Sequence, residues 1–369
     1  MVNGHMSNIP HIAIIILNWN GLKDTLECLE SVFKNTYPNY SVYLIDNGST
    51  SDANLQEEAM RIMQRPCEST NKTQHSLLFI QNSENLGFAE GNNVGIRRAI
   101  TDGAEYIFTL NNDTVVDRDF LTEAIKCMLH PFSFPYAPNG PYTLSIPSPI
   151  GIVATTMLQY YDHARIDSLG HDLLTCGDSI PRGRGELFSQ FLRPHSSAIF
   201  SAPSSLQATS YQLHPVLGAC AGAALYSVDM LRQIGLFDPD FFLNYEDADL
   251  SLRALVQGWR IVHSPTSIIY HKGNASIGKI KNTAYRIRSQ RNMLWAYLNN
   301  IPLPVLLLNL PWILIRDFLG IVLSALFLQF SIKKILVISR WQVLRSFPTI
   351  LKKRRSVLCR KQISSFWIW

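Results

Sequence analysis

Continuous apolar runs alternate with amphipathic stretches over roughly the first third of the chain. Residues 12–17 form an unbroken, mostly β-branched run, which predicts a strand buried on both faces. Residues 22–35 then carry apolar side chains at helical spacing. The strand pattern recurs three more times, at residues 41–45, 77–81 and 106–110. Four strand–helix units in order predict an α/β fold with a mainly parallel central sheet and right-handed crossovers.

A polar cluster follows each of these predicted strands. The clusters begin at Asn18, Asp46, Asn85 and Asn111, and the third is predicted to be a loop over 85–93 that leads into a helix ending at Ile100. Because open α/β sheets bind ligands outside the carboxyl ends of their strands, these clusters predict one shared binding site.

The second half of the chain is less regular. Residues 131–149 and 193–210 are predicted to be irregular insertions, and the small residues of 218–224 would let the backbone approach a ligand closely. A polar helix is predicted at 283–299, and the stretch after it, 301–330, is almost entirely apolar.

Three carboxylates, Glu246, Asp247 and Asp249, follow an aromatic run and begin a predicted helix. A carboxylate beside buried aromatic rings costs free energy unless a ligand or a reaction uses it. A predicted strand then ends at His271. This segment therefore indicates a chemical site rather than a part of the core.

The chain resembles the inverting glycosyltransferases of family 2, which have the GT-A fold, and in particular their rhamnosyltransferase-like branch. The resemblance extends from about residue 10 to about residue 275. It rests on three motifs that occur in family order: Asn85-Leu86-Gly87-Phe88-Ala89 with Gly91-Asn92-Asn93, then Asn111-Asn112-Asp113-Thr114, and then 235–253. It implies a GT-A catalytic domain at 8–280 and a C-terminal helical region at 281–369.

The resemblance also implies roles for individual residues. Asp247 is expected to be the base that deprotonates the acceptor hydroxyl, with Glu246 as an orienting or charge-tuning neighbour, and the helix dipole favours an ionised Asp247. Asp113 is expected to hold Mn²⁺ or Mg²⁺, because hard cations favour oxygen ligands. His271 is expected to complete the metal shell, as a histidine at this place does in some members of the family. The nucleotide of the sugar donor is expected to contact Asn18, Trp19, Asp46, Asn47, Asn85, Gly87, Asn92 and Asn112.

Structural alternatives exist for several of these residues. Asp46 and Asp113 could each cap a helix. His271 could be a structural residue at a strand end. Asp249 is interpreted as part of a solvated helix face, where it pairs with Arg253. Lys272, Arg288 and Arg291 are weaker candidates for contacts to a diphosphate or a lipid phosphate.

Charge is distributed unevenly along the chain. The net charge is +5, yet residues 331–369 contain ten Lys and Arg and no acid, which leaves 23 basic and 28 acidic residues elsewhere. The six cysteines are scattered, which argues against a disulfide framework or a zinc site and favours a reducing compartment.

The apolar stretch 301–330 is interrupted by Arg316-Asp317 and three prolines, so neither half reaches the length of about 20 residues that a membrane span needs. We expect helices that lie in the interface of an anionic membrane at its cytoplasmic face, anchored by Trp312, Trp341 and the cluster at 352–355. The alternatives are one imperfect span, or a soluble helical hairpin that caps the catalytic domain or forms a homodimer. No recognisable nucleic-acid-binding module is present.

The sequence thus predicts a metal-dependent transferase that moves a sugar from dTDP-rhamnose or a UDP-hexose to a lipid-linked saccharide. A sugar-1-phosphate nucleotidyltransferase would need a glycine-rich, basic loop after the first strand, and Asn18-Trp19-Asn20-Gly21 lacks it. A non-catalytic membrane scaffold descended from a transferase is the remaining alternative, because the metal motif keeps only one of its acids.

Overall fold

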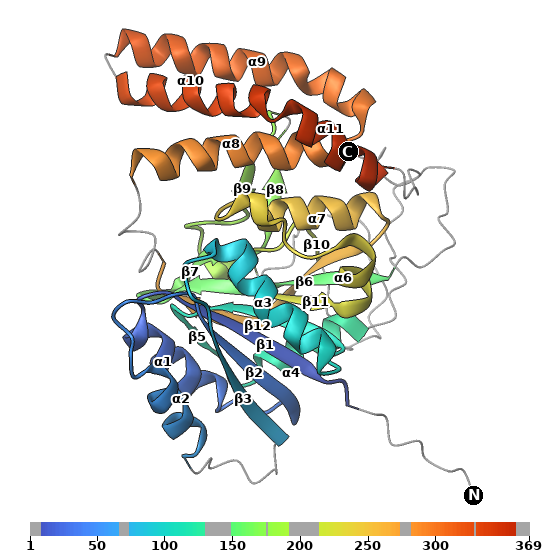
Figure 1. Ribbon diagram of the computed structural model, residues 1–369. Helices are drawn as coiled ribbons and strands as arrows, with labels where there is room; N and C mark the ends of the chain where they lie inside the picture. The colour runs from blue at the N-terminus through green and yellow to red at the C-terminus, as the bar shows by residue number, and fades with distance from the viewer. Residues whose placement is uncertain are drawn as a thin grey trace, which may run out of the picture.

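The computed structural model describes residues 9–65, 74–129, 149–174, 176–191, 214–273, 282–327 and 330–358. The core is a ten-stranded sheet with helices on both faces, and a stack of further helices lies beyond it (Figure 1). The α/β fold with a central sheet and a C-terminal helical region is therefore confirmed. The predicted insertions at 131–149 and 193–210 lie almost wholly outside the described residues.

The first half of the chain forms the parallel part of the sheet, as predicted. Its strands pair in the order β4–β1–β2–β3. The elements of this half are β1 (Ile12–Asn18), α1 (Leu22–Val32), β2 (Asn39–Asp46), α2 (Leu55–Met63), β3 (Gln74–Gln81), α3 (Gly87–Thr101), β4 (Tyr106–Asn111), β5 (Thr114–Val116) and α4 (Phe120–Leu129).

The second half extends the sheet with both parallel and antiparallel pairings. β12 runs parallel to β6, whereas β11 joins β4 and β6 in antiparallel orientation. The elements are β6 (Ile150–Gln159), β7 (Asp162–Ser168), β8 (His171–Leu173), β9 (Ser179–Pro181), α5 (Phe188–Phe191), β10 (His214–Pro215), β11 (Ala223–Ser227), α6 (Val228–Ile234), a 3₁₀ turn (Pro239–Phe241), α7 (Glu246–Val256) and β12 (Arg260–His271).

The two faces of β1 show why this strand is apolar throughout. Ile12, Ile14 and Ile16 pack in the core under α1, α2 and α4, while Ala13 and Ile15 pack in the opposite core under α3, α6 and α7. Successive side chains of a strand point to opposite faces, so a strand covered on both sides needs apolar residues at every position.

α3 begins earlier than predicted. Gly87, expected in a loop, is its first residue and has a φ of +79°, and a Cβ there would lie 2.6 Å from Phe242. The Phe242 carbonyl accepts hydrogen bonds from the backbone N–H groups of Phe88 and Ala89. A distant residue thus satisfies the first donors of the helix, which local sequence could not reveal.

Four C-terminal helices stack above α7: α8 (Thr283–Asn300), α9 (Leu303–Leu326), α10 (Phe330–Arg345) and α11 (Phe347–Leu358). A third core joins them to the part of the chain that contains the sheet, because Phe241, Ala248 and Leu252 pack with Met293 and Trp295 of α8. The C-terminal region is therefore attached through a shared apolar core.

The length argument against a membrane span was wrong. α9 is a single helix of 24 residues that continues through Pro311, and by length and composition it could cross a membrane, which by itself is weak support. Pro304 lies in the first turn, where its missing N–H is tolerated. Asp317 is bound by both Arg316 and Arg340, so the interrupting charges are neutralised within the helical stack.

The solvated interpretation of Asp249 was also wrong, although its pairing with Arg253 is confirmed. The two side chains lie 2.8 Å apart with exposed fractions of 3% and 10%. The Asp249 carboxylate also accepts a hydrogen bond from Asn300 of α8, and Arg253 donates to the carbonyls of Ile234 and Leu236.

We expect Asp249→Asn to lower the free energy of unfolding by about 2 kcal/mol, because it leaves a buried arginine without its counter-charge. Chemical denaturation measures this. The matched control is Asp229→Asn, which removes an exposed carboxylate 3.7 Å from Arg232 and should change stability by less than about 0.5 kcal/mol. Equal effects of the two variants would show that burial does not strengthen the Asp249 pair.

Candidate active site

One cavity of about 580 Å³ lies where the carboxyl ends of β1, β2 and β4 meet the start of α7. Its volume is within the range of pockets that bind small molecules. Residues from the predicted motifs line it together: Trp19, Asn47, Asn85, Gly87, Asn112, Asp113, Glu246, Asp247 and His271.

Three other predicted residues do not line this cavity: Asn18, Asp46 and Asn92. Asn18 is fully buried, and its amide donates to Asp46 (3.0 Å) and Asp52 (2.9 Å). Asn92 lies inside α3, where its amide donates to the carbonyl of Phe88. In this structure these side chains hold the strand ends and the helix together behind the cavity wall.

Asn47 organises one wall of the cavity. Its amide nitrogen donates to Asn85 Oδ1 (3.0 Å) and to the Gly87 carbonyl (3.1 Å). Its amide oxygen accepts from the side chain of Asn82 and the backbone of Leu86. One asparagine at the end of β2 thereby fixes the whole β3–α3 connection.

Asp113 and His271 lie side by side, as predicted, with 3.3 Å between Oδ1 and Nε2. They meet because β5 and the end of β12 pair antiparallel. Asp113 lies between β4 and β5, so it caps no helix. The other ring nitrogen of His271, Nδ1, donates to Asp167 at 2.8 Å. Sequence reasoning missed Asp167, which the β7 strand brings to the site.

The electrostatics of His271 follow from these neighbours. Burial lowers its pKa, but hydrogen bonds to Asp113 and Asp167 outweigh burial and raise the pKa to about 9. Burial raises the pKa of Asp167, and the hydrogen bond to His271 more than offsets this, so its pKa is lowered. Without a cation, the two carboxylates of Asp113 and Asp167 therefore favour the protonated form of His271.

The donor set fits a divalent cation. A carboxylate oxygen suits Mg²⁺ or Mn²⁺. A metal-binding histidine almost always donates its second ring N–H to a carboxylate, a backbone carbonyl or water, and His271 donates its own to Asp167. Asp113 and His271 are thus the residues that would hold the ion, with Asp167 orienting the imidazole.

The loop before α7 has an unusual backbone. Phe242, Asn244 and Tyr245 all have positive φ values, of 61°, 72° and 67°. Such conformations cost free energy in residues other than glycine and persist only where surrounding contacts hold them. Fully buried Asn292 of α8 supplies those contacts by donating to the carbonyls of Phe241, Leu243 and Asn244, at 2.8 to 3.1 Å.

The two acids at the start of α7 have different surroundings. Asp247 lines the cavity, and its carboxylate accepts backbone hydrogen bonds from Ala221 (3.2 Å) and Ala248 (2.8 Å). Glu246 is 5% exposed, and its Oε2 atom has no hydrogen-bond partner among the described residues. Burial, followed by the charge of Asp247, raises the pKa of Glu246 well above its usual value. Burial and the neighbouring charge therefore favour the protonated form of Glu246.

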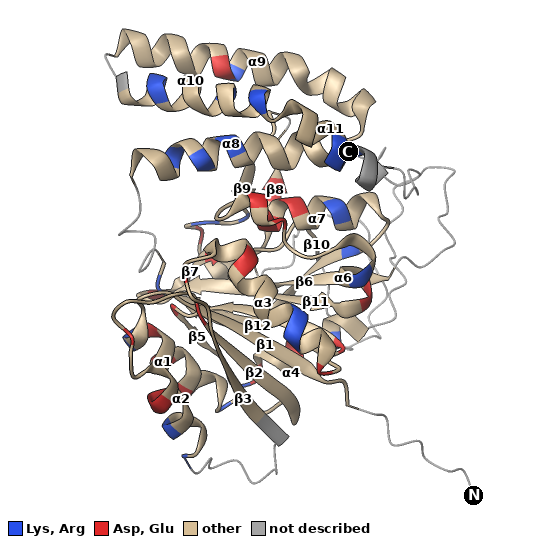
Figure 2. Ribbon diagram, in the orientation of Figure 1, with Lys and Arg blue, Asp and Glu red and all other residues tan. Residues whose placement is uncertain are grey.

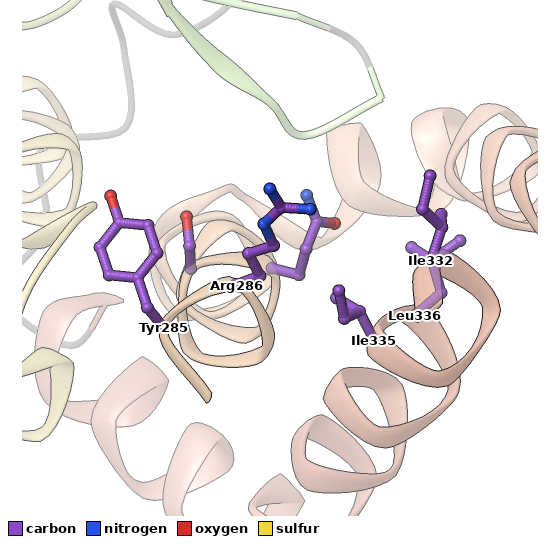
Figure 3. A pocket seen from close by; sticks show the side chains of 7 residues that line it. Tyr285, Arg286, Ile332, Ile335 and Leu336 are labelled. Atoms are coloured by element: carbon purple, nitrogen blue, oxygen red, sulfur yellow. The ribbon is translucent and has the colours of Figure 1, made fainter. Parts of the chain in front are cut away.

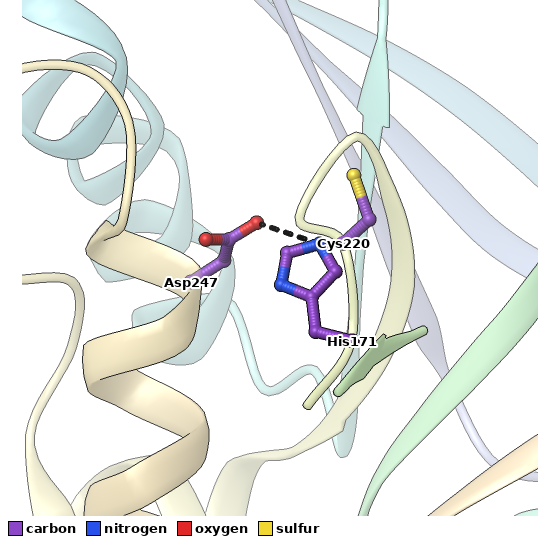
Figure 4. Close-up of side chains that lie close together, drawn as sticks. All are labelled: His171, Cys220 and Asp247. Atoms are coloured by element: carbon purple, nitrogen blue, oxygen red, sulfur yellow. Dashed lines mark ion pairs between the residues drawn. The ribbon is translucent and has the colours of Figure 1, made fainter. Parts of the chain in front are cut away.

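A histidine that sequence reasoning missed lies beside Asp247. His171 Nε2, from β8, is 3.9 Å from Asp247 Oδ2, and the Cys220 thiol completes the group (Figure 4). Burial raises the pKa of Cys220, so its thiol stays protonated. His171 lies in a region of short strands and turns, where only its residue type could have drawn attention.

The three cations proposed for phosphate contacts are placed differently. Lys272 binds Asp24 and Glu27, and Arg291 donates to Asn292 and the Asp240 carbonyl. Neither lines the cavity. Arg288 does line it, and its guanidinium stacks 4.4 Å from the centre of the Phe242 ring.

The sequence matches two protein families. Glycosyl transferase family 2 matches residues 13–137, and Glycosyl transferase family group 2 matches residues 158–369. No curated protein matches the sequence significantly.

Solved structures that are similar to this chain include a mannosyltransferase and S. aureus TarS. The mannosyltransferase PcManGT from Pyrobaculum calidifontis, in complex with GDP-Man and Mn²⁺, is 15% identical; the match covers 96% of this chain and 87% of the other, with a TM-score of 0.49. S. aureus TarS 1-349, in complex with UDP, is 14% identical, with 94% and 91% covered and a TM-score of 0.43.

The second family match covers more than half of the chain and includes Asp167, His171, Asp247 and His271, while the first includes Asp113. The chain belongs to glycosyl transferase family group 2.

Proposed function

We propose that this chain is an inverting, metal-dependent glycosyltransferase that moves one sugar from a nucleotide-sugar donor to an acceptor hydroxyl. The main support is the single cavity that has the Asp113–His271 pair and the Asp247 carboxylate in its lining. A transfer of this kind needs a cation for the leaving diphosphate and a base for the acceptor. Both kinds of group open onto the same space.

Asp247 is the proposed base. Backbone N–H groups hold its carboxylate in one orientation, and the N-terminus of α7 favours negative charge there. It accepts the proton of the acceptor hydroxyl as the oxygen attacks the anomeric carbon from the face opposite the diphosphate. Attack from that face inverts the configuration at this carbon.

Asp113 and His271 would hold the cation, which would supply positive charge to stabilise the departing diphosphate. Asn47 and Asn85 contribute amide groups, and Trp19 an aromatic ring, to the part of the cavity that we assign to the nucleotide. The rhamnosyltransferase-like motif Asn111-Asn112-Asp113 supports dTDP-rhamnose as the donor, with a UDP-hexose as the alternative.

A thermal-shift panel tests the donor. UDP-, dTDP- and GDP-sugars are each added with and without Mn²⁺ to the folded protein. We expect a metal-dependent rise in Tm with one nucleotide, because a ligand that binds only the folded state stabilises it. The absence of a shift with every donor would contradict the proposal and favour a non-catalytic scaffold.

We further propose that the enzyme works at the cytoplasmic face of a membrane on a lipid-linked saccharide. α9 exposes a broad apolar surface that includes Leu308, Trp312 and Phe318, at 75%, 58% and 66%. Exposed apolar patches this extensive mark interaction sites. Basic residues predominate over α8, α10 and α11 (Figure 2), which favours an anionic lipid surface over a homodimer.

We expect the triple variant Leu308→Ser, Trp312→Ser and Phe318→Ser to bind vesicles of phosphatidylcholine and phosphatidylglycerol at least about 10-fold more weakly. Burying each of these side chains is worth about 1.5 kcal/mol or more. Co-sedimentation measures the change. This variant is preferable to a deletion of 301–369, because the deletion would also expose the face of α8 that packs in the core.

The matched control replaces Leu129, Tyr161 and Leu187 with Ser, since these are also exposed but lie on the catalytic part. It should bind vesicles like the wild type. Unchanged binding by the α9 variant would contradict a membrane role for this helix.

A further inference from the structure

A second pocket, of about 230 Å³, lies between α8 and α10. Tyr285 and Ser289 of α8 line both this pocket and the catalytic cavity. The two spaces therefore adjoin along one face of α8. A ligand that extends past Tyr285 and Ser289 would reach from one into the other.

The second pocket has one polar and one apolar side. Arg286 and Gln290 of α8 line it together with Ile332, Ile335 and Leu336 of α10. Arg286 lies between Tyr285 and the three apolar side chains (Figure 3). A site with a guanidinium beside aliphatic side chains suits a ligand that joins an anionic group to a hydrocarbon chain.

The guanidinium of this pocket differs from others in the helical stack. Within the residues that the structure describes, Arg286 forms no ion pair with an acid, and neither do the exposed Lys333 and Lys334 of α10, whereas Arg316 and Arg340 share Asp317. From 282 to 358 the sequence contains a single acid, Asp317. The pocket thus carries positive charge that the described protein does not neutralise, which favours an anion.

Exposed apolar side chains follow the apolar side of the pocket along α10. Ile332 is 40% exposed, and Val337, Trp341 and Leu344 farther along α10 are exposed at 49%, 65% and 66%. A pocket of about 230 Å³ is smaller than those that enclose a whole drug-sized ligand. It would therefore hold the anionic group and the first part of a chain, with the rest of the chain in the bilayer.

We propose that the pocket between α8 and α10 binds the phosphate end of a lipid, and that this lipid carries the acceptor saccharide. Arg286 binds the phosphate, Ile332, Ile335 and Leu336 contact the start of the chain, and the saccharide passes Tyr285 and Ser289 toward Asp247. This inference rests on the proposed function, because it assigns the acceptor's anchor to that same enzyme.

Binding of farnesyl diphosphate to the full-length protein in detergent tests the site. Inorganic pyrophosphate and farnesol serve as probes for the anion alone and the chain alone. We expect farnesyl diphosphate to bind at least about 10-fold more tightly than either, because only it occupies both sides of the pocket. Titration calorimetry measures the three affinities without requiring turnover.

Two variants separate the contributions. Arg286→Gln should weaken farnesyl diphosphate at least about 10-fold through loss of a charge-assisted hydrogen bond. Ile332→Ser should weaken farnesyl diphosphate but leave pyrophosphate unchanged. The matched control is Arg345→Gln, which removes an exposed arginine of α10 that does not line the pocket, and it should bind within about twofold of the wild type.

Equal affinity for pyrophosphate and farnesyl diphosphate would overturn the lipid site and indicate a site for free anions. Unchanged binding by Arg286→Gln would overturn the assignment of this pocket. Failure of the proposed function can be distinguished from failure of the lipid site. A protein that binds farnesyl diphosphate but no nucleotide sugar would support the lipid site and contradict the transferase activity. Arg286 lies outside the catalytic cavity, so its variant should keep donor binding.

Discussion

Asp247→Asn is expected to lower kcat by at least about 10²-fold, the usual scale of general-base catalysis, while donor affinity stays the same. The amide keeps the size of the side chain but cannot accept the proton of the acceptor hydroxyl. The cavity and the proposed cation site remain, because Asp113, in the β4–β5 connection, and His271, at the end of β12, lie outside α7. Single-turnover transfer and donor titration, measured on the same preparation, separate the two quantities.

Two neighbouring acids provide controls for this result. Glu246→Gln should change kcat by less than about 10-fold, because burial favours the protonated form of Glu246 and glutamine has nearly the shape of that form. Asp249→Asn should lose stability but retain kcat in the folded fraction, since Asp249 faces Arg253 and Asn300. A larger loss for Glu246→Gln than for Asp247→Asn would exchange the roles of these two acids.

Asp113→Ala is expected to abolish metal-dependent donor binding and to lower kcat/KM by at least about 10²-fold. The substitution removes the carboxylate of the proposed cation site and leaves His271 paired only with Asp167. Two measurements check it: Mn²⁺ titration followed by electron paramagnetic resonance, and the Tm shift with donor in the presence of Mn²⁺.

The matched control for this prediction is Asp119→Ala. Asp119 is an exposed aspartate just beyond β5 that contacts Thr36 rather than the cavity. It should bind Mn²⁺ and donor like the wild type. Wild-type Mn²⁺ affinity in Asp113→Ala would show that the cation, if bound, uses other residues.

Local sequence pattern was sufficient for the parallel half of the sheet. β1 is apolar at nearly every position because cores lie on both of its faces, and β4 repeats the pattern. A periodicity of this kind is a property of neighbouring residues, so it can be interpreted without knowing the fold. The same holds for the position of Asp113 after a strand and of Asp247 at a helix start.

Contacts between distant parts of the chain determined the features that local sequence did not predict. Asp167 meets His271 across 104 positions, and His171 meets Asp247 through an irregular segment of short strands. Asp249 looked like a surface residue because its helix spacing with Arg253 is common on exposed faces. It is buried because α8 packs over α7 and supplies Asn300.

The sequence by itself determined the α/β class, the family motifs and the residues that line one end of the sheet, because these depend on local periodicity and residue type. Only the tertiary structure decided which side chains face the cavity. Asn18 and Asp46 end their strands as expected, yet they hydrogen-bond to each other behind its wall. It also decided that α8 connects two parts of the molecule. Asn292 of α8 binds the loop before α7, and the same helix packs with the C-terminal helices that carry the apolar surface. Burial and hydrogen-bond partners are set by elements distant in the chain, and no local pattern encodes them.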